Sequence, residues 1–309
     1  MNRIRELLKH KNIDYIENFD VAEISTIKIR AILKIAIFPK CVEDLVKALK
    51  CLWQNKIEFI VVGNVSNVLF CEMVSFPVII TSKMKDEYEI KGNTISFSAG
   101  MQLSRALEIL KRNKLGGVEG LFGIPATIGG AIINNAGAFN YNISSKLVSI
   151  RVFHDGNIKN IDAESIKFGY HYSNLKGIVL LSASFLFENK SEYDIIKLYN
   201  EYTYRRTVSQ PNGLSLGSVY QKVDGLSAGF YIERAGLKGV RVGGIYVSSK
   251  HSNFFLNDKS GSSDDFLCLQ KIVEDRVEKQ FGVSLISEIE KVGDNNEIIG
   301  RSPHTFKKL

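Results

Sequence analysis

The chain has 309 residues, of which 45% are hydrophobic and 24% charged, a globular balance that excludes long disordered regions. Forty Lys and Arg against 33 Asp and Glu give a net charge of +7, but the basic residues are scattered. This charge favours an anionic small-molecule ligand, such as a nucleotide or phosphate, over nucleic acid.

Cysteines and histidines do not predict a metal site. The four cysteines show neither a CxxC pair nor ligand spacing, and the five histidines are dispersed along the chain. The N-terminus lacks an apolar signal-peptide core, and no run of about 18 apolar residues occurs. We therefore expect a cytoplasmic protein with reduced thiols, no metal and no membrane association.

The first unit is expected to cover residues 1–80. Apolar runs predict strands at 32–38, 59–62 and 77–81, and apolar residues at helical spacing predict a helix at 42–53. The loop after the second strand offers backbone amides, a hydroxyl and two carboxamides, which suit phosphate oxygens as well as an ordinary turn. Its residues are Gly63, Asn64, Val65, Ser66 and Asn67.

The second unit is expected to cover residues 81–206. Strands are predicted at 94–99, 149–153 and 179–187, with helices at 103–110 and for about fifteen residues from 191. Residues 116–137 hold seven glycines in twenty-two positions, with apolar and amide side chains between them. Such a segment indicates a backbone that approaches a large flat ligand closely, although a tight loop packed on itself is the alternative.

The third unit is expected to cover residues 207–309. A helix is predicted at 226–235 and another at 263–281, the latter capped by Ser263 or Asp264 and ended by Gly282. Phe266, Leu269, Val273 and Val277 should form its buried face. No flexible linker is evident, so the three units are expected to pack around a shared site.

Two side chains in this unit could carry chemistry. Ser218 follows a glycine without a G-x-S-x-G pattern, so it is either a turn serine or a proton donor whose ion is stabilised nearby. Glu288 has apolar neighbours that could desolvate it, but it could equally be a surface glutamate. His251 and Asn253 are interpreted as structural polar residues.

Six sequence blocks that occur in a fixed order favour the functional interpretation of Ser218 and Glu288 over the structural one. The blocks are GIPATIGGAIINNAGAF, FGYHYS, QPNGLSLGSVYQK, IERAGLKG, SSKHSNFFLN and LISEIEKVG. Together they resemble the UDP-N-acetylenolpyruvoylglucosamine reductase family, in its shorter second type, over residues 25–293. The resemblance implies an α+β fold, with a two-part FAD-binding module of the vanillyl-alcohol-oxidase (PCMH) type. A C-terminal α+β substrate-binding domain follows, whose last residues could pack back on the first unit.

The resemblance also implies an activity. In this family NADPH reduces FAD, which reduces the UDP-linked enolpyruvyl amino sugar to UDP-N-acetylmuramate for peptidoglycan synthesis. Ser218 matches the proton donor and Glu288 the catalytic glutamate, while Tyr170, Arg206 and Lys222 are expected to bind substrate. A monomer is expected. FAD should contact the loop at 63–67 and a second set of residues: Gly123, Ile124, Pro125, Ala126, Gly129, Gly130, Ala131, Asn135 and Ala136.

The chain departs from the family pattern at several positions. His171 stands where the family has a catalytic arginine, and a histidine carries charge only when protonated. Lys222 or Arg206 could supply the missing cation. Arg30, Ala31, Asn64, Val65 and Ala126 replace glycines or a glycine-rich loop. Two alternatives therefore stay open: a FAD- or nucleotide-binding member with weakened or lost turnover, and another flavin oxidase.

Overall fold

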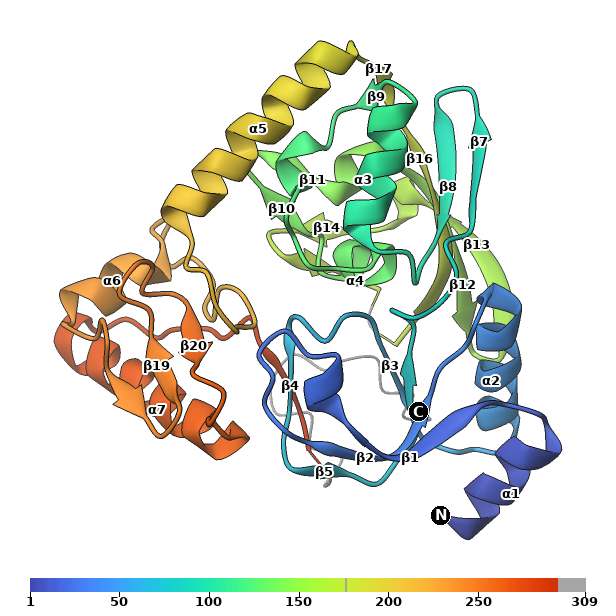
Figure 1. The fold of residues 1–309 in the computed structure, drawn as a ribbon, viewed down its shortest axis with the longest axis horizontal. Helices are drawn as coiled ribbons and strands as arrows, with labels where there is room; N and C mark the ends of the chain where they lie inside the picture. Colours follow the sequence, from blue (N-terminus) through green and yellow to red (C-terminus); the bar gives the residue numbers. More distant parts are fainter. Residues whose placement is uncertain (176, 294–309) are drawn as a thin grey trace.

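The computed structural model describes residues 1–175 and 177–293, which form three units (Figure 1). The first unit has a sheet in the order β1-β2-β6-β3, in which β2, β6 and β3 are parallel and β1 is antiparallel. β5 also pairs with β2. Its elements are α1 (Asn2–His10), β1 (Tyr15–Asp20), β2 (Ile32–Ile37), α2 (Val42–Gln54), β3 (Ile60–Val62), β4 (Val68–Phe70), β5 (Met73–Val74) and β6 (Val78–Ile80).

α2 joins the first unit to the second. Its apolar residues at helical spacing are buried, as the sequence predicts. They share a core with Ile35 and Ile79 of the first sheet and with Phe153, Val179 and Leu181 of the second sheet. These two units therefore pack against each other through α2 and hold their facing loops at a fixed separation.

The second unit is a five-stranded antiparallel sheet in the order β13-β12-β16-β8-β7, with α3 and α4 on one face. Helix α4 begins after Thr127, whose hydroxyl accepts a hydrogen bond from the Gly130 amide. The elements are β7 (Tyr88–Lys91), β8 (Thr94–Ser98), α3 (Leu103–Arg112), β9 (Leu115–Gly116), η2 (Glu119–Leu121), α4 (Ile128–Ile133), β10 (Gly137–Ala138), β11 (Tyr141–Asn142), β12 (Leu147–His154), β13 (Asn157–Asp162), β14 (Phe168–Gly169), β15 (Tyr172–Ser173), β16 (Val179–Leu186) and β17 (Glu188–Asn189). The predicted strands and helices of this unit are confirmed, with shifted ends.

The third unit packs α6 (Ala228–Arg234) and α7 (Ser263–Phe281) on a small sheet of β18 (Arg241–Val242), β19 (Ile245–Val247) and β20 (Phe255–Asn257). The expected cap of α7 is wrong. Ser262 is the cap, because its hydroxyl accepts from the Asp265 amide while the Asp265 carboxylate accepts from the Ser262 amide. Helix α6 begins after Ser227, whose hydroxyl accepts a hydrogen bond from the Gly229 amide without a reciprocal bond. The left-handed Gly282 ends α7, as predicted.

α5 (Glu192–Ser209) crosses from the second unit to the third (Figure 1). It runs through the boundary expected at residue 206, so we propose that the third unit begins at residue 210. β21 (Glu290–Val292) returns to the first unit and pairs in parallel with β4. Residues 294–309 of the expected third unit lie outside the described residues. No described helix is long and apolar enough to cross a membrane.

Candidate active site

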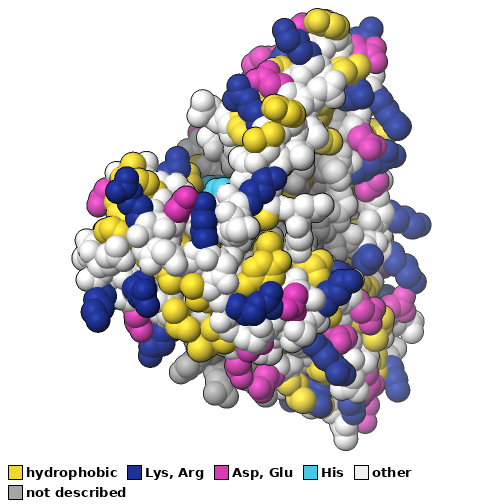
Figure 2. Space-filling view, turned by 60° about the vertical axis from the view of Figure 1, so that its left-hand side comes forward, with side chains coloured by type: hydrophobic (Ala, Val, Ile, Leu, Met, Phe, Trp, Pro, Cys, Tyr) yellow, Lys and Arg dark blue, Asp and Glu magenta, His cyan; other side chains and the backbone are white. Residues whose placement is uncertain are grey.

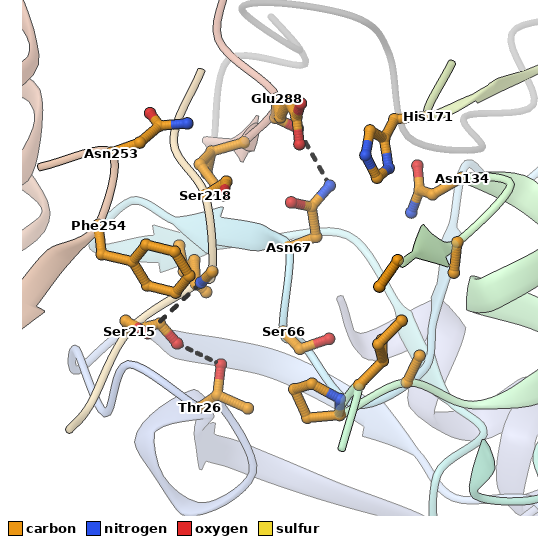
Figure 3. Close-up of a pocket in the computed structure, with 18 of the residues that line it drawn as sticks. Thr26, Ser66, Asn67, Asn134, His171, Ser215, Ser218, Asn253, Phe254 and Glu288 are labelled. Carbon is orange, nitrogen blue, oxygen red and sulfur yellow. Dashed lines mark hydrogen bonds between the residues drawn. The ribbon is translucent and has the colours of Figure 1, made fainter. Parts of the chain in front are cut away.

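A cleft of about 730 Å³ opens where the three units meet. Figure 2 shows the hollow, with a histidine inside it and basic side chains beside it. Its wall is formed by segments 63–68 and 123–127, the Tyr170-His171 turn, and residues 215–218, 220–222 and 287–290. The structure therefore brings together almost all the residues that the sequence singled out for binding and catalysis (Figure 3).

The first-unit loop presents unused backbone donors to this cleft. Among the hydrogen bonds between described residues, none is donated by the backbone N–H groups of Asn64, Val65, Ser66 or Asn67. Val65 has a φ of +49°, rare for a β-branched residue, and its carbonyl accepts from the Thr26 amide and the Ser25 hydroxyl. Left-handed turns of this kind direct successive amides at an anion.

The glycine-rich segment forms the facing wall. Gly63 approaches Thr127 so closely that an added Cβ would lie 2.4 Å from the Thr127 hydroxyl oxygen. Gly123 has a φ of +82°, whereas Ala126 has no positive φ, so alanine is accepted there without strain. The expected cofactor residues that line the cleft on this side are Gly123, Ile124, Pro125, Ala126, Gly130, Ala131 and Ala136.

Two residues of the expected cofactor set lie behind this wall. The Gly129 amide donates to the Ala99 carbonyl, and a Cβ at Gly129 would press on Ala99. Asn135 is buried, and its side chain donates to the Gly169 carbonyl over 2.8 Å. Both therefore support the cleft from behind: Gly129 by close packing, and Asn135 by holding the turn that carries Tyr170 and His171.

Ser218 and Glu288 come together through a short ladder of backbone bonds. Segment 218–221 lies between residues 253–254 and 286–288: the Val219 amide donates to the Asn253 carbonyl, and the Glu288 amide donates to the Val219 carbonyl. Both side chains line the cleft. The ladder thus places the serine and the glutamate on one wall, although 69 positions separate them in the sequence.

Asn253 anchors this ladder, which confirms its interpretation as a structural residue. Its side-chain oxygen accepts from the Tyr220 amide and its side-chain nitrogen donates to the Tyr220 carbonyl. On the other side, the Asn67 side chain donates to the Glu288 carbonyl over 3.0 Å. Thr26 likewise donates to the Ser215 carbonyl over 2.7 Å, a contact that no sequence pattern indicates.

Tyr170, His171 and Lys222 form a second group in the cleft. The Lys222 ammonium lies 5.4 Å from the centre of the Tyr170 ring, and the Tyr170 and His171 rings meet edge to face at 4.2 Å. Burial lowers the pKa of His171, and the positive charge of Lys222 lowers it further. His171 is therefore neutral at pH 7, and Lys222 provides the positive charge of this group.

Arg206 lines the cleft from α5. Its guanidinium donates to the Gly120 carbonyl and to the Gln210 side chain, each over 3.3 Å. Burial lowers its pKa, and no ion pair joins it to a carboxylate of the described chain. A desolvated cation without an acidic partner is suited to an anionic ligand group.

Arg30 and Ala31 do not line the cleft. The Arg30 side chain is 81% exposed and pairs with Asp20 at 3.1 Å, while Ala31 is buried beside β2. Asn64, in contrast, exchanges two side-chain hydrogen bonds with Gln102 and so joins the first-unit loop to the second unit. Of the departures from the family pattern, the loop, Ala126 and His171 line the cleft, whereas Arg30 and Ala31 do not.

The fold and the cleft define a flavoprotein. Residues 33–161 match the model of an FAD binding domain, and residues 210–292 match that of the UDP-N-acetylenolpyruvoylglucosamine reductase C-terminal domain. The donor set fits FAD, because four loop amides that have no acceptor among the described residues lie in the cleft, and a side chain at Gly63 would collide with Thr127 of the facing wall. FAD is therefore the cofactor, and the chain is a flavin-dependent oxidoreductase with a two-part FAD-binding module.

Comparison with known proteins specifies the family. Reductases of this name from Caldicellulosiruptor saccharolyticus and Caldicellulosiruptor bescii are 33% and 34% identical over 93% of this chain, covering 94% and 93% of their own lengths. The crystal structure of the Thermus caldophilus reductase superposes with a TM-score of 0.77 at 28% identity, over 90% of this chain and 98% of that chain. The chain belongs to the UDP-N-acetylenolpyruvoylglucosamine reductase family.

Proposed function

We propose that this protein reduces UDP-N-acetylenolpyruvoylglucosamine to UDP-N-acetylmuramate with NADPH, a reduction of a carbon–carbon double bond. The observation that carries the proposal is the placement of Ser218 and Glu288 on one wall of the same cleft that holds the loop amides suited to FAD. Bound FAD would supply the hydride chemistry. The residues of the chain bind and orient the two substrates and move the proton.

Ser218 is proposed as the proton donor. Hydride addition to the terminal enolpyruvyl carbon leaves negative charge on the carbon next to the carboxylate, and this carbon must then be protonated. The backbone ladder at Val219 fixes the serine, and Glu288 on the adjacent segment is proposed to stabilise the change of charge at the serine hydroxyl. Positioned proton transfer of this kind contributes about 10² to 10⁴-fold in rate.

Lys222 is proposed to bind the substrate carboxylate. Lys222 is four residues beyond Ser218, and its positive charge is close enough to lower the pKa of His171 on the facing turn. A permanent ammonium there compensates for a neutral imidazole at position 171, which can donate one hydrogen bond but brings no charge. Tyr170 limits the movement of the ammonium by offering the face of its ring.

The test is anaerobic reduction of the FAD-loaded protein by NADPH, followed by addition of the enolpyruvyl substrate. Stoichiometric NADPH oxidation with formation of UDP-N-acetylmuramate is expected. Bound FAD with no reoxidation by the substrate would instead support the alternative of a binding protein without turnover. Rapid reoxidation by oxygen alone, with no effect of the substrate, would support a flavin oxidase.

A further inference from the structure

A hairpin turn beside the cleft holds an aromatic residue in an uncommon backbone conformation. β10 pairs with β11 so that Ala138 faces Tyr141, which leaves Phe139 and Asn140 as the turn. Their φ angles are +53° and +66°, a combination that favours asparagine and glycine. Asn140 suits this turn, but Phe139 does not, so surrounding contacts must hold it there.

Those contacts come from α5. The Phe139 ring stacks on the Tyr202 ring, with centroids 5.0 Å apart and planes inclined by 21°. One turn later on the same helix face, the Arg206 guanidinium carbon lies 5.3 Å from the centre of the Phe139 ring. The hairpin ring is thus held by Tyr202 and in turn covers one face of the Arg206 guanidinium.

Little else fixes that guanidinium. Its two hydrogen bonds within the described residues, to Gly120 and Gln210, are both long at 3.3 Å, and its buried Nε has no partner among those residues. A Cβ built at Gly123 would lie 3.0 Å from the Arg206 Cδ. The Arg206 side chain therefore lies against both the glycine-rich wall and the hairpin ring, and its Nε has no acceptor among the described residues.

We infer that Phe139 is a positioning residue: its ring holds the Arg206 guanidinium at the wall of the cleft, where it binds an anionic group of a nucleotide ligand. Phe139 itself does not line the cleft. The inference rests on the proposed function for the kind of ligand, a uridine diphosphate sugar or NADPH. It gives a reason for a strained aromatic turn residue beside a half-buried cation that has no carboxylate partner among the described residues.

The experiment uses the full FAD-loaded chain with three substitutions at one position. Phe139→Asn relieves the backbone strain but removes the ring, Phe139→Leu keeps the apolar volume but removes the ring, and Phe139→Tyr keeps the ring. An effect shared by the first two and absent in the third belongs to the ring. A matched control is Tyr204→Gln on α5, the helix that carries Tyr202 and Arg206, because Tyr204 is 70% exposed.

Affinities for UDP and for NADP⁺ are measured separately by calorimetry, together with KM and kcat for both substrates. Phe139→Asn and Phe139→Leu should each lower the affinity for one of the two ligands about 10-fold, as expected for loss of a partly desolvated cation–π contact. The corresponding KM should rise with kcat changed less than about twofold. FAD content should stay unchanged, and Phe139→Tyr should behave like the parent.

A double-mutant cycle with Arg206→Met tests whether the ring acts through the guanidinium. Phe139→Asn should add almost nothing to Arg206→Met, because the group that it positions is already gone. Additive effects, unchanged affinities for both ligands, or a parent protein that binds neither ligand would each overturn the inference. Failure of the proposed function would look different: UDP and NADP⁺ would bind with the same dependence on the ring, but NADPH would not reduce the substrate.

Discussion

The Asn67 side chain donates a 3.0 Å hydrogen bond to the backbone carbonyl of Glu288 and so joins the first-unit loop to the wall that carries Ser218 and Glu288. The Glu290 amide donates back to the Asn67 carbonyl, and β21 continues the contact along β4. The loop suited to FAD phosphates and the segment that carries the glutamate are therefore one connected structure.

Asn67→Ala should lower kcat while the protein keeps its fold. Loss of the side-chain bond costs about 1 kcal/mol of unfolding free energy. It also frees the Glu288 segment, so kcat should fall more than that change in stability would explain. Asn113→Ala is a suitable control, since the Asn113 side chain donates a comparable bond to Ile109 far from the cleft. Equal activity losses in the two variants would contradict the prediction.

Ser218→Ala should separate the two half-reactions. Reduction of the flavin by NADPH needs no proton from the serine and should proceed at the parental rate. Reoxidation by the enolpyruvyl substrate should slow by about 10² to 10⁴-fold, the range expected for a lost general acid. Stopped-flow absorbance of the flavin measures both steps. If both slow to the same extent, Ser218 is not the proton donor.

Lys222→Met should raise the substrate KM about 10- to 100-fold, because a charge-assisted hydrogen bond to a carboxylate is lost. The same change removes the positive charge beside His171, so the pKa of that imidazole should rise toward its ordinary value. NMR titration of the ring protons measures this rise. Lys167→Met, on an exposed residue of the neighbouring segment, should change neither quantity.

Arg30→Gly should have no measurable effect on FAD content or on kcat. The Arg30 side chain is exposed and lies outside the cleft, and its pairing with Asp20 is the surface kind that adds little to stability. Flavin content after gel filtration and steady-state kinetics test this. A clear gain in either quantity would show that the family glycine at this position acts on the site.

Stability should fall as the solution becomes acidic. Burial lowers the pKa of His171 and of His251 in the folded state. Below about pH 6.5 these two imidazoles are therefore protonated in the unfolded chain before they are protonated in the folded chain. Their stabilisation is complete above that pH and is lost as pH falls toward the lower folded values. Melting temperatures of the parent and of His171→Asn should converge at acid pH, whereas His10→Gln, at an exposed helix end, should follow the parent.

Local sequence patterns predict the helices in which buried apolar residues recur at regular spacing. The predicted core face of α7 is fully buried, and α2 is found where apolar spacing places it, since both depend on neighbours three and four residues apart. The predicted cap of α7 is wrong because Ser262, Ser263, Asp264 and Asp265 are consecutive and all of them are common capping residues. Only the backbone geometry selects Ser262.

The site depends on contacts that no local pattern records. The blocks around residues 63, 123 and 218 indicate which residues matter, but the proximity of Lys222 to His171, 51 positions apart, follows from the packing of two units. The same holds for Thr26 on Ser215 and for Arg206 under Phe139. Arg30 shows the converse, because this departure from the motif is an exposed side chain outside the cleft, and the sequence alone does not reveal that position.

The pairing of β21 with β4 joins two segments that are synthesised at very different times. Asn67 and the Glu288 carbonyl that it binds are 221 residues apart, so during synthesis the first-unit loop lacks this contact until the segment around residue 288 has been made. Contacts of such long range slow folding, because a long stretch of chain must close before they form. A chain cut short before residue 288 would therefore lack both the glutamate and the contact that holds the first-unit loop to its segment.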